Sequence, residues 1–341
     1  MGGWSARLES KELEVGETMS KWQTFRLMPS YCFRYFCTVN TSLSNWILLI
    51  VLSSIWGSSF ILMKLGMETT SGETIFTHTQ VAALRMSIAA LFLLPFTIKA
   101  FKKLTWNNIW KLSIVGLLGN FLPAFLFTFA ETGISTGYTG MLNSCTPIFA
   151  LIIGFLVFQN RLNGFQILGV IIGTLGIVGL TLSGQNVSLD GSWIHVGAVV
   201  LATLGYAISL NTIKYTLQHL KSTEITALSF FIILLPGIPA VIFSGAFDTI
   251  HTNPHAWTGL GFITILSVIG TAFAVILFNR LISNSSILFA SSVTYLIPVV
   301  ALLIGIGFNE EINVYQIGSM LVILSGVFVA NVIGRKRKQT R

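Results

Sequence analysis

Two prolines interrupt long apolar runs, and polar side chains lie one helical turn before each of them. The residues are Asn143, Ser144 and Pro147 in one run and Thr294, Tyr295 and Pro298 in the other. A proline removes a backbone donor and loosens a helical turn, and in lipid the freed carbonyl must face protein or a water-filled cavity. The pattern predicts hydrogen-bonding groups that line a solute cavity near mid-membrane. The alternative is that the prolines only kink helices for packing, while Asn and Thr bond across helices.

Aromatic and amide side chains on other apolar runs are predicted to supply the walls of the same cavity. They are Trp56, Asn120, Phe127, Tyr206 and Phe278. Such a cavity suits an amphipathic solute with an apolar or aromatic body. The alternative for the aromatic residues is ordinary packing between helices.

Three cationic residues lie inside or at the ends of apolar runs. Arg85 is about two turns inside its run, where a charge is costly and is usually functional or paired. It is expected either to attract an anionic carboxylate or, as the favoured alternative, to form a structural clamp with an acidic residue. The candidate acidic partners are Glu68, Glu73 and Glu131. Lys64 and Lys214 lie at helix ends, where snorkelling explains them and gating is the alternative.

Several kinds of chemistry are not expected. All twelve Asp and Glu residues fall in loops or tails, so coupling through a buried acid is disfavoured relative to facilitated diffusion or exchange. His251 and His255 are separated by Pro254 in a loop, so no metal site is predicted there. The chain has no HExxH, GxSxG or P-loop motif, and we predict no cofactor, no enzymatic activity and no primary pumping by this chain alone.

The elements that must position these residues are membrane-spanning helices. The chain has 341 residues, of which 53% are hydrophobic and 9% charged, whereas soluble domains carry roughly 25% charged residues. The apolar residues form blocks of about 20, the length that crosses a bilayer as a helix. The predicted fold is an all-α integral membrane protein with ten transmembrane helices. The predicted spans are 46–66, 79–99, 110–129, 138–158, 165–183, 193–213, 225–244, 257–278, 286–308 and 314–333.

The Lys and Arg residues between and after these spans lie on alternate loops. Beyond the N-terminal tail, thirteen lie in loops or the C-terminal tail on one predicted side of the membrane and none in the opposite loops. The positive-inside rule then places both termini in the cytoplasm. The net charge of +8 is explained by this distribution, so no nucleic-acid partner is expected. The expected partners are the lipid bilayer and a small-molecule metabolite.

The sequence of residues 137–180 is repeated in the second half of the chain, where Pro298 corresponds to Pro147 and Gly305 to Gly154. The repeat extends over five spans in each half, and an odd number forces the second copy to be inverted. Inverted halves permit alternating access. The predicted domains are a cytoplasmic tail at 1–45, five-helix repeats at 46–183 and 193–333, and a basic cytoplasmic tail at 334–341.

The order, spacing and duplication of several motifs resemble the EamA branch of the drug/metabolite transporter superfamily, over about residues 46–333. The motifs are Trp56-Gly57 followed by Lys64, Leu84-Arg85-Met86, the Pro147 helix, and Gln166 with Gly169 at the start of span 5. The resemblance implies a ten-helix carrier that exports small metabolites, amino acids among them. It also implies a central cavity lined by spans 1, 3, 4, 6, 8 and 9. The chain departs from the family at Asn160, where a Glu is common, and at Ser229, the nearest counterpart of Arg85.

The leading hypothesis is a secondary transporter of the plasma membrane, which would be the inner membrane in a Gram-negative bacterium. An integral membrane enzyme, a non-transporting receptor or scaffold, and a channel are the alternatives. Gly169, Gly173 and Gly176 form a small-residue face on span 5. We expect this face to pack within the chain, with a homodimer seam as the alternative.

Overall fold

The computed structural model describes residues 43–159, 163–182, 192–291, 293–307 and 313–329, all of them within one compact unit, Leu43–Arg341. In these ranges the regular structure is helical, apart from one isolated antiparallel bridge between Glu68 and Thr74. Seven helical segments there are long and apolar enough to cross a membrane. The predicted all-α class of a multi-pass membrane protein is therefore confirmed.

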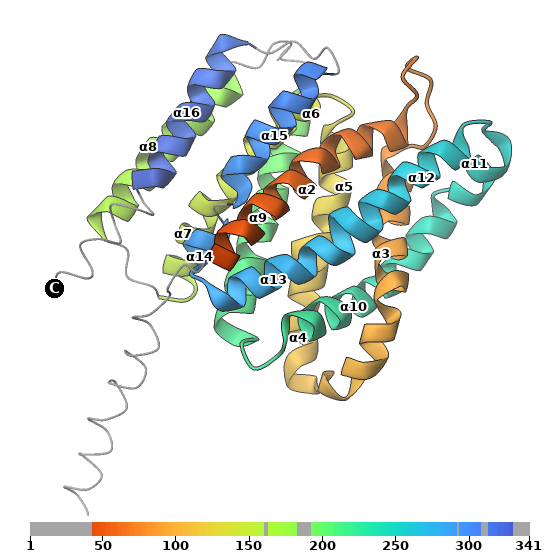
Figure 1. Ribbon diagram of the computed structural model, residues 1–341, viewed down its shortest axis with the longest axis horizontal. Coiled ribbons are helices and arrows are strands. Elements are labelled where there is room, and N and C mark those ends of the chain that lie inside the picture. Colours follow the sequence, from red (N-terminus) through yellow and green to blue (C-terminus); the bar gives the residue numbers. More distant parts are fainter. Residues whose placement is uncertain (1–42, 160–162, 183–191, 292, 308–312, 330–341) are drawn as a thin grey trace, which may run out of the picture. The chain divides into compact units, whose positions relative to one another are not determined.

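The seven segments correspond to predicted spans 1–4 and 6–8 (Figure 1). They are α2 (Leu43–Met67), α3 (His78–Ala100) with η1 (Phe101–Lys103), α4 (Trp106–Gly116) with η2 (Leu117–Phe121) and α5 (Leu122–Ala130), α6 (Thr136–Leu142) with η3 (Asn143–Cys145) and α7 (Thr146–Leu156), α9 (Ser192–Thr216), α10 (Ser222–Phe243), and α12 (Ala256–Ser267) with η4 (Val268–Phe273) and α13 (Ala274–Asn284).

The remaining three predicted spans coincide with helices that are shorter or interrupted within the described residues. They are α8 (Gly164–Leu182), α14 (Ile287–Ser291) followed by α15 (Val293–Gly307), and α16 (Val314–Phe328). One further helix, α11 (Ala246–Thr252), lies in a loop that the apolar pattern does not predict as helical. The predicted tails, 1–45 and 334–341, lie almost entirely outside the described residues.

Two segments inside the long helices are π-helical, and they occupy equivalent places in the two halves of the sequence. They are η2, between α4 and α5, and η4, between α12 and α13. A π-helical turn leaves one carbonyl without its usual partner four residues on, and such turns are frequent at functional sites. Here a side chain five residues later completes each turn: Asn120 Nδ2 donates to Val115 O at 3.0 Å, and Thr271 Oγ1 donates to Leu266 O at 3.0 Å.

The first helix of each predicted half packs against the third and fourth helices of the other half. Helix α2 contacts α12, α13 and α15, and helix α9 contacts α4, α5 and α7. Two further pairs join corresponding helices of the two halves, namely α3 with α10 and α8 with α16. Figure 1 shows the last pair side by side. This reciprocal pattern is what a duplicated sequence with two matching halves would produce.

The α8–α16 contact uses the predicted small-residue face. A Cβ added at Gly326 would lie 2.7 Å from Gly169 O and 2.5 Å from Gly173 N, and one added at Gly176 would lie 2.7 Å from Ile323 N. These backbones therefore touch, and the glycines of α8 are occupied within the chain. A homodimer seam would require another surface.

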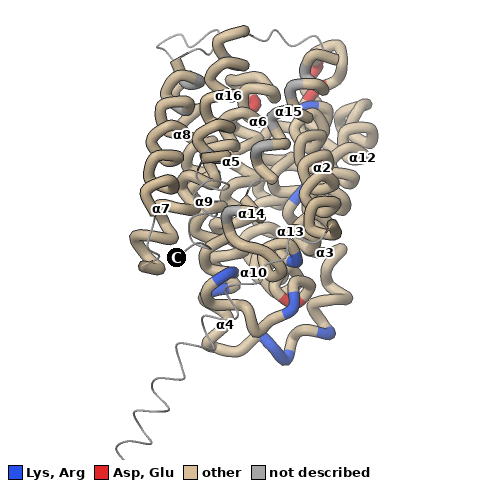
Figure 2. The backbone as a smooth tube through the Cα atoms, turned by 60° about the vertical axis from the view of Figure 1, so that its left-hand side comes forward, with Lys and Arg blue, Asp and Glu red and all other residues tan. Residues whose placement is uncertain are grey.

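Most of the Lys and Arg residues lie toward one end of the helices and most of the Asp and Glu residues toward the other, as Figure 2 shows; Lys64, Arg85 and Glu224 are exceptions. Lys99, Lys102, Lys103 and Arg280 lie near the end where α3 stops and α4 begins, which we call the basic end. Glu68, Glu73, Glu131 and Asp248 lie near the end where α2 stops and α3 begins, which we call the acidic end.

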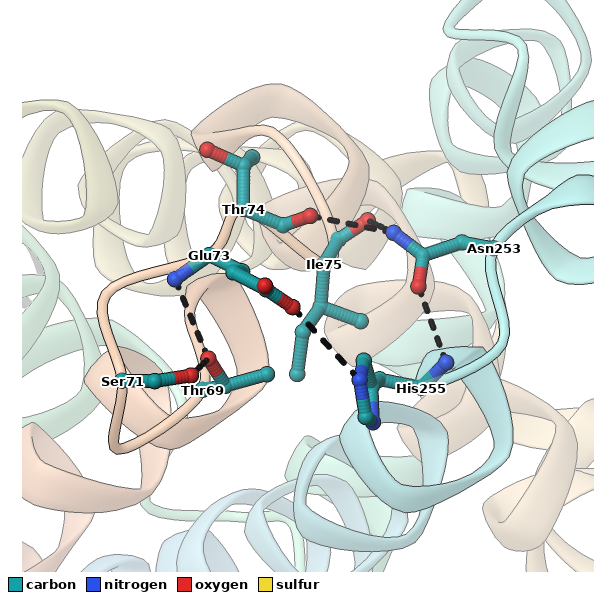
Figure 3. Close-up of polar contacts among 7 residues, drawn as sticks. All are labelled: Thr69, Ser71, Glu73, Thr74, Ile75, Asn253 and His255. Atoms are coloured by element: carbon teal, nitrogen blue, oxygen red, sulfur yellow. Dashed lines mark hydrogen bonds and ion pairs between the residues drawn. The ribbon is translucent and has the colours of Figure 1, made fainter.

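At the acidic end, the α2–α3 loop is tied to the α11–α12 loop (Figure 3). Asn253 Nδ2 donates to Thr74 O at 3.0 Å and to Ile75 O at 3.4 Å. His255 Nε2 lies 3.6 Å from the Glu73 carboxylate, with side chains 50% and 69% exposed. An ion pair this exposed contributes little, so the backbone acceptors of Asn253 carry most of the connection.

Candidate functional site

A cavity lies between the two halves, at the level of the π-helical segments. Its volume is about 100 Å³, several times what a single water molecule requires. Its wall includes residues of α2, α3, α4, α5, α9, α13 and α15, together with η2, η3, η4 and the first residue of α7. We call it the central cavity.

Ten pairs of lining residues occupy equivalent positions in the two halves, at an offset of 150 or 151 residues. They are Trp56/Tyr206, Ser59/Ser209, Phe60/Leu210, Met63/Ile213, Gly119/Gly270, Asn120/Thr271, Ala124/Val275, Phe127/Phe278, Asn143/Thr294 and Thr146/Ile297. The other lining residues have no partner in this sense. They are Arg85, Met86, Val115, Asn279 and Ile282.

Seven of the residues predicted to form the cavity do line it. They are Trp56, Asn120, Phe127, Asn143, Tyr206, Phe278 and Thr294. The aromatic members contact one another: Trp56 meets Phe278 edge-on at 4.8 Å between ring centroids, and Phe127 stacks on Tyr206 at 5.8 Å. Trp56 Nε1 also donates to Gly270 O at 3.0 Å, within the second π-helical segment. Their role in binding a solute stays a prediction.

Ser144 and Pro147 do not line the cavity, contrary to the expectation from sequence. Pro147 lies in the first turn of α7, where a missing N–H costs nothing. The carbonyl it would have bonded, Asn143 O, accepts hydrogen bonds from the backbone N–H of Thr146 and from Thr146 Oγ1, the latter at 2.9 Å. Thr146 therefore repairs the interruption, and it lines the cavity in place of Pro147. The side chains of Tyr295 and Pro298 lie outside the described residues.

Arg85 lines the cavity and bonds neutral groups rather than the predicted acidic ones. Its Nε donates to Thr271 Oγ1 at 2.8 Å, and its Nη1 to Met63 Sδ at 3.3 Å. Glu68 and Glu73 instead lie 3.9 Å from Lys64 and 3.6 Å from His255. The prediction that Glu68 or Glu73 pairs with Arg85 is therefore wrong, because both side chains lie in the loop beyond the end of α2. Glu131 interacts with Arg85 electrostatically.

Lys214, which is predicted to snorkel, donates hydrogen bonds to backbone carbonyls at the end of a neighbouring helix. The side chain is half-buried, and Nζ donates to Ile282 O at 3.0 Å and to Ser285 O at 2.7 Å. These are carbonyls at the C-terminal end of α13, where the helix dipole favours a positive charge. Lys214 thereby ties α9 to α13 beside Ile213 and Ile282, two lining residues near the basic end of the cavity.

Sequence reasoning missed several polar residues at this site. Ser59, Ser209, Thr271 and Asn279 all line the cavity, and Asn279 Nδ2 donates to Thr226 Oγ1 at 2.8 Å. A signal was present for the two serines, because they repeat at the same offset as Trp56 and Tyr206. The carboxylate oxygens of Glu131 are buried although the residue follows the end of α5, so its position in a loop did not indicate exposure.

Comparison with known proteins adds an independent finding. A sequence profile described as the EamA-like transporter family matches residues 44–182 and again residues 193–332. A probable amino-acid metabolite efflux pump of Escherichia coli (strain K12) is 23% identical over 310 residues, covering 88% of this chain and 99% of its own. An uncharacterized transporter of Archaeoglobus fulgidus is 24% identical over 296 residues, covering 86% of this chain and all of its own. A solved crystal structure shares the fold with a TM-score of 0.59 and 14% identity, over 86% of this chain and 99% of that one.

Proposed function

The chain belongs to the EamA-like transporter family, and on that premise we propose that it is a secondary transporter that exports small metabolites by alternating access around the central cavity. Membership of the family confirms the resemblance seen in the motifs and indicates membrane transport. Amino acids are the first substrates to consider, because one relative is described as a probable amino-acid metabolite efflux pump.

The observation that carries this proposal is the set of ten equivalent residue pairs around one cavity. In a carrier made of two inverted five-helix halves, each state resembles the other with the halves exchanged. A solute bound between equivalent positions then stays in contact with both halves while they move. The reciprocal packing of α2 and α9 on the opposite halves supports the same arrangement of ten helices.

The chemical character of the lining suits an amphipathic solute. Aromatic rings supply apolar contact, amide and hydroxyl groups supply hydrogen bonds, and Arg85 supplies a positive charge. Ligand sites commonly combine such an apolar wall with a few polar groups that fix orientation. The basic end faces the cytoplasm in this proposal, with both termini on that side of the plasma membrane.

Counterflow in proteoliposomes tests the proposal directly. Vesicles containing the protein are loaded with one unlabelled amino acid, and uptake of the same labelled amino acid is measured for each member of a panel. We expect at least one to enter faster than into protein-free vesicles. No acceleration for any solute, together with no shift in thermal stability by any of them, would overturn the transporter assignment.

A pair of matched variants tests whether transport uses the central cavity. Val275→Trp adds bulk to a half-buried residue of the lining. Phe273→Trp adds bulk two residues away, on a side chain that is 50% exposed on the outside of the helices. Counterflow is expected to fall strongly in the first variant and to be retained in the second. Equal activity of the two variants would place the solute pathway elsewhere.

A further inference from the structure

Thr271, in the second π-helical segment η4, makes two hydrogen bonds through its hydroxyl group. The Thr271 hydroxyl has a single proton, which it donates to Leu266 O, the carbonyl left open by the π turn, at 3.0 Å. The oxygen can then act toward other groups only as an acceptor. It accepts from Arg85 Nε at 2.8 Å. Thr271 is only 2% exposed, so these two protein contacts set the orientation of its hydroxyl group.

Arg85 is consequently held by hydrogen bonds to uncharged side chains. Thr271 Oγ1 and Met63 Sδ accept from two of its five N–H donors, and neither carries a charge. The other three donors make no further hydrogen bond within the part of the chain that the structure describes. The Glu131 carboxylate interacts with the guanidinium electrostatically. A fixed guanidinium with free donors in a cavity has the geometry that suits a planar carboxylate.

The other half has a π turn completed by a side chain, but it has no arginine beside that turn. Asn120, the counterpart of Thr271, also completes its π turn by donating to Val115 O at 3.0 Å. No arginine occupies the position that corresponds to Arg85, because the nearest counterpart is Ser229, whose hydroxyl donates to Thr226 O at 3.0 Å. The positively charged side chain of the lining therefore comes from one half, and Arg85 is one of the five lining residues without an equivalent in the other half.

We propose that Thr271 is a positioning residue that holds Arg85 in place. The Arg85 guanidinium, which has no counterpart in the other half, is then the recognition point for the carboxylate of the solute in the central cavity. This inference rests on the proposed function, since it assigns part of the chemistry of the same cavity. It makes Thr271 act on the solute through Arg85. Removing the hydroxyl should weaken recognition of the carboxylate and leave recognition of the apolar body intact.

Binding of matched probes to the full chain in lipid nanodiscs tests the proposal. The probes are phenylacetate, 3-phenylpropionate and hexanoate, each paired with its own carboxamide, and affinity is read from the concentration dependence of thermal stability. The wild-type chain is expected to bind the carboxylates more tightly than the carboxamides. Thr271→Val, of nearly the same size, should lose about tenfold in carboxylate affinity, since a hydrogen bond to a charged group is involved.

Two comparisons separate positioning from general damage to the fold. Thr271→Ser keeps the hydroxyl and should retain the carboxylate preference, whereas Arg85→Lys keeps the charge but loses the planar donors and should lose the preference. Carboxamide affinity reports the integrity of the cavity, and in Thr271→Val and Arg85→Lys the loss for each carboxylate should exceed the loss for its carboxamide. Equal losses for carboxylates and carboxamides in Thr271→Val would overturn the positioning role, as would a wild-type chain without a carboxylate preference.

The outcome is distinguishable from failure of the proposed function. Counterflow without any carboxylate preference would leave the transporter assignment standing and remove the recognition point. A carboxylate preference that depends on Thr271, in a chain that moves no solute, would support the recognition point and overturn transport.

Discussion

At the scale of single residues, Lys214 shows how a charge is accommodated inside this protein without an acidic partner. Its ammonium bonds two carbonyls at the end of α13, Ile282 O and Ser285 O. Those carbonyls lack partners within their own helix. The contact therefore supplies donors for carbonyls at the end of α13 and acceptors for a half-buried cation, and it joins α9 to α13 next to the cavity.

Replacing Lys214 by Met keeps the apolar stem and removes both hydrogen bonds. We expect a loss of about 2 kcal/mol in stability, the size of hydrogen bonds that involve a charged group. The measurement is the thermal unfolding midpoint of the purified chain in one fixed lipid. Lys102→Met is the matched control, because Lys102 is exposed in η1 and its replacement should leave the midpoint unchanged. Equal midpoints for the two variants would contradict the structural role of Lys214.

At the scale of elements, the two π-helical segments are supported by close contacts with the opposite half. Gly270 in η4 lies against Ser59 of α2, where an added Cβ would be 2.8 Å from the serine Oγ. Gly119 in η2 lies against Ser209 of α9 so closely that an added Cβ would overlap the serine side chain. Each glycine thus lets a first helix approach the π turn of the other half.

Gly270→Ala should destabilise the fold by about 1–3 kcal/mol, because it overpacks this contact. The double variant Gly270→Ala with Ser59→Ala should recover part of the loss, since Ser59 Cβ would lie 3.9 Å from the new methyl group, whereas Leu266 Cδ1 would still lie 3.1 Å from it. Gly261→Ala in α12 meets nothing within 4 Å, and helix propensity predicts a gain of up to about 1 kcal/mol. Chemical denaturation of the three variants measures these differences. Additive effects of the two substitutions in the double variant would contradict the contact.

The helices themselves could be predicted from sequence, because apolar blocks of bilayer length report directly on burial in lipid. The predicted span 46–66 compares with α2 at Leu43–Met67, and 225–244 with α10 at Ser222–Phe243. The lining positions of Trp56 and Tyr206 could also be predicted, because duplication places them at equivalent positions.

The π turns could not be predicted in this way. They depend on contacts between residues far apart in the chain, such as Gly270 with Ser59, which no local pattern records. An extra residue in the turn also changes which side chains face the cavity, and this is why Thr271 was missed as the partner of Arg85. The sequence shows that Pro147 lacks a backbone donor, and this is why it predicts Pro147 in the lining. It does not show that Thr146 Oγ1 donates a hydrogen bond to the carbonyl concerned, Asn143 O.

At the scale of the whole molecule, the separation of basic and acidic ends makes the orientation in the membrane testable. Cysteine labelling with an impermeant maleimide requires positions that are exposed in loops at opposite ends. Ser71 at the acidic end and Lys102 at the basic end are both exposed. Cys145 is buried, so a chain in which Cys32 and Cys37 are replaced by Ser provides the background.

We expect Ser71→Cys to be labelled in intact cells and Lys102→Cys only after the membrane is permeabilised. The reason is the positive-inside rule, which places the Lys-rich loops in the cytoplasm. The reverse pattern would show that the chain is inserted the other way, and labelling of both positions in intact cells would contradict the assignment of these loops to opposite sides.

Several lining pairs are equivalent in position but not in chemistry: Trp56 corresponds to Tyr206, Phe60 to Leu210, and Met63 to Ile213. When two inverted halves exchange roles, the solute therefore does not meet a mirror image of the environment it left. Its half-saturation concentration should differ between the two faces of the membrane. For an uncoupled carrier, detailed balance then requires the maximal rates to differ by the same factor, so that neither direction is favoured when the concentrations are equal.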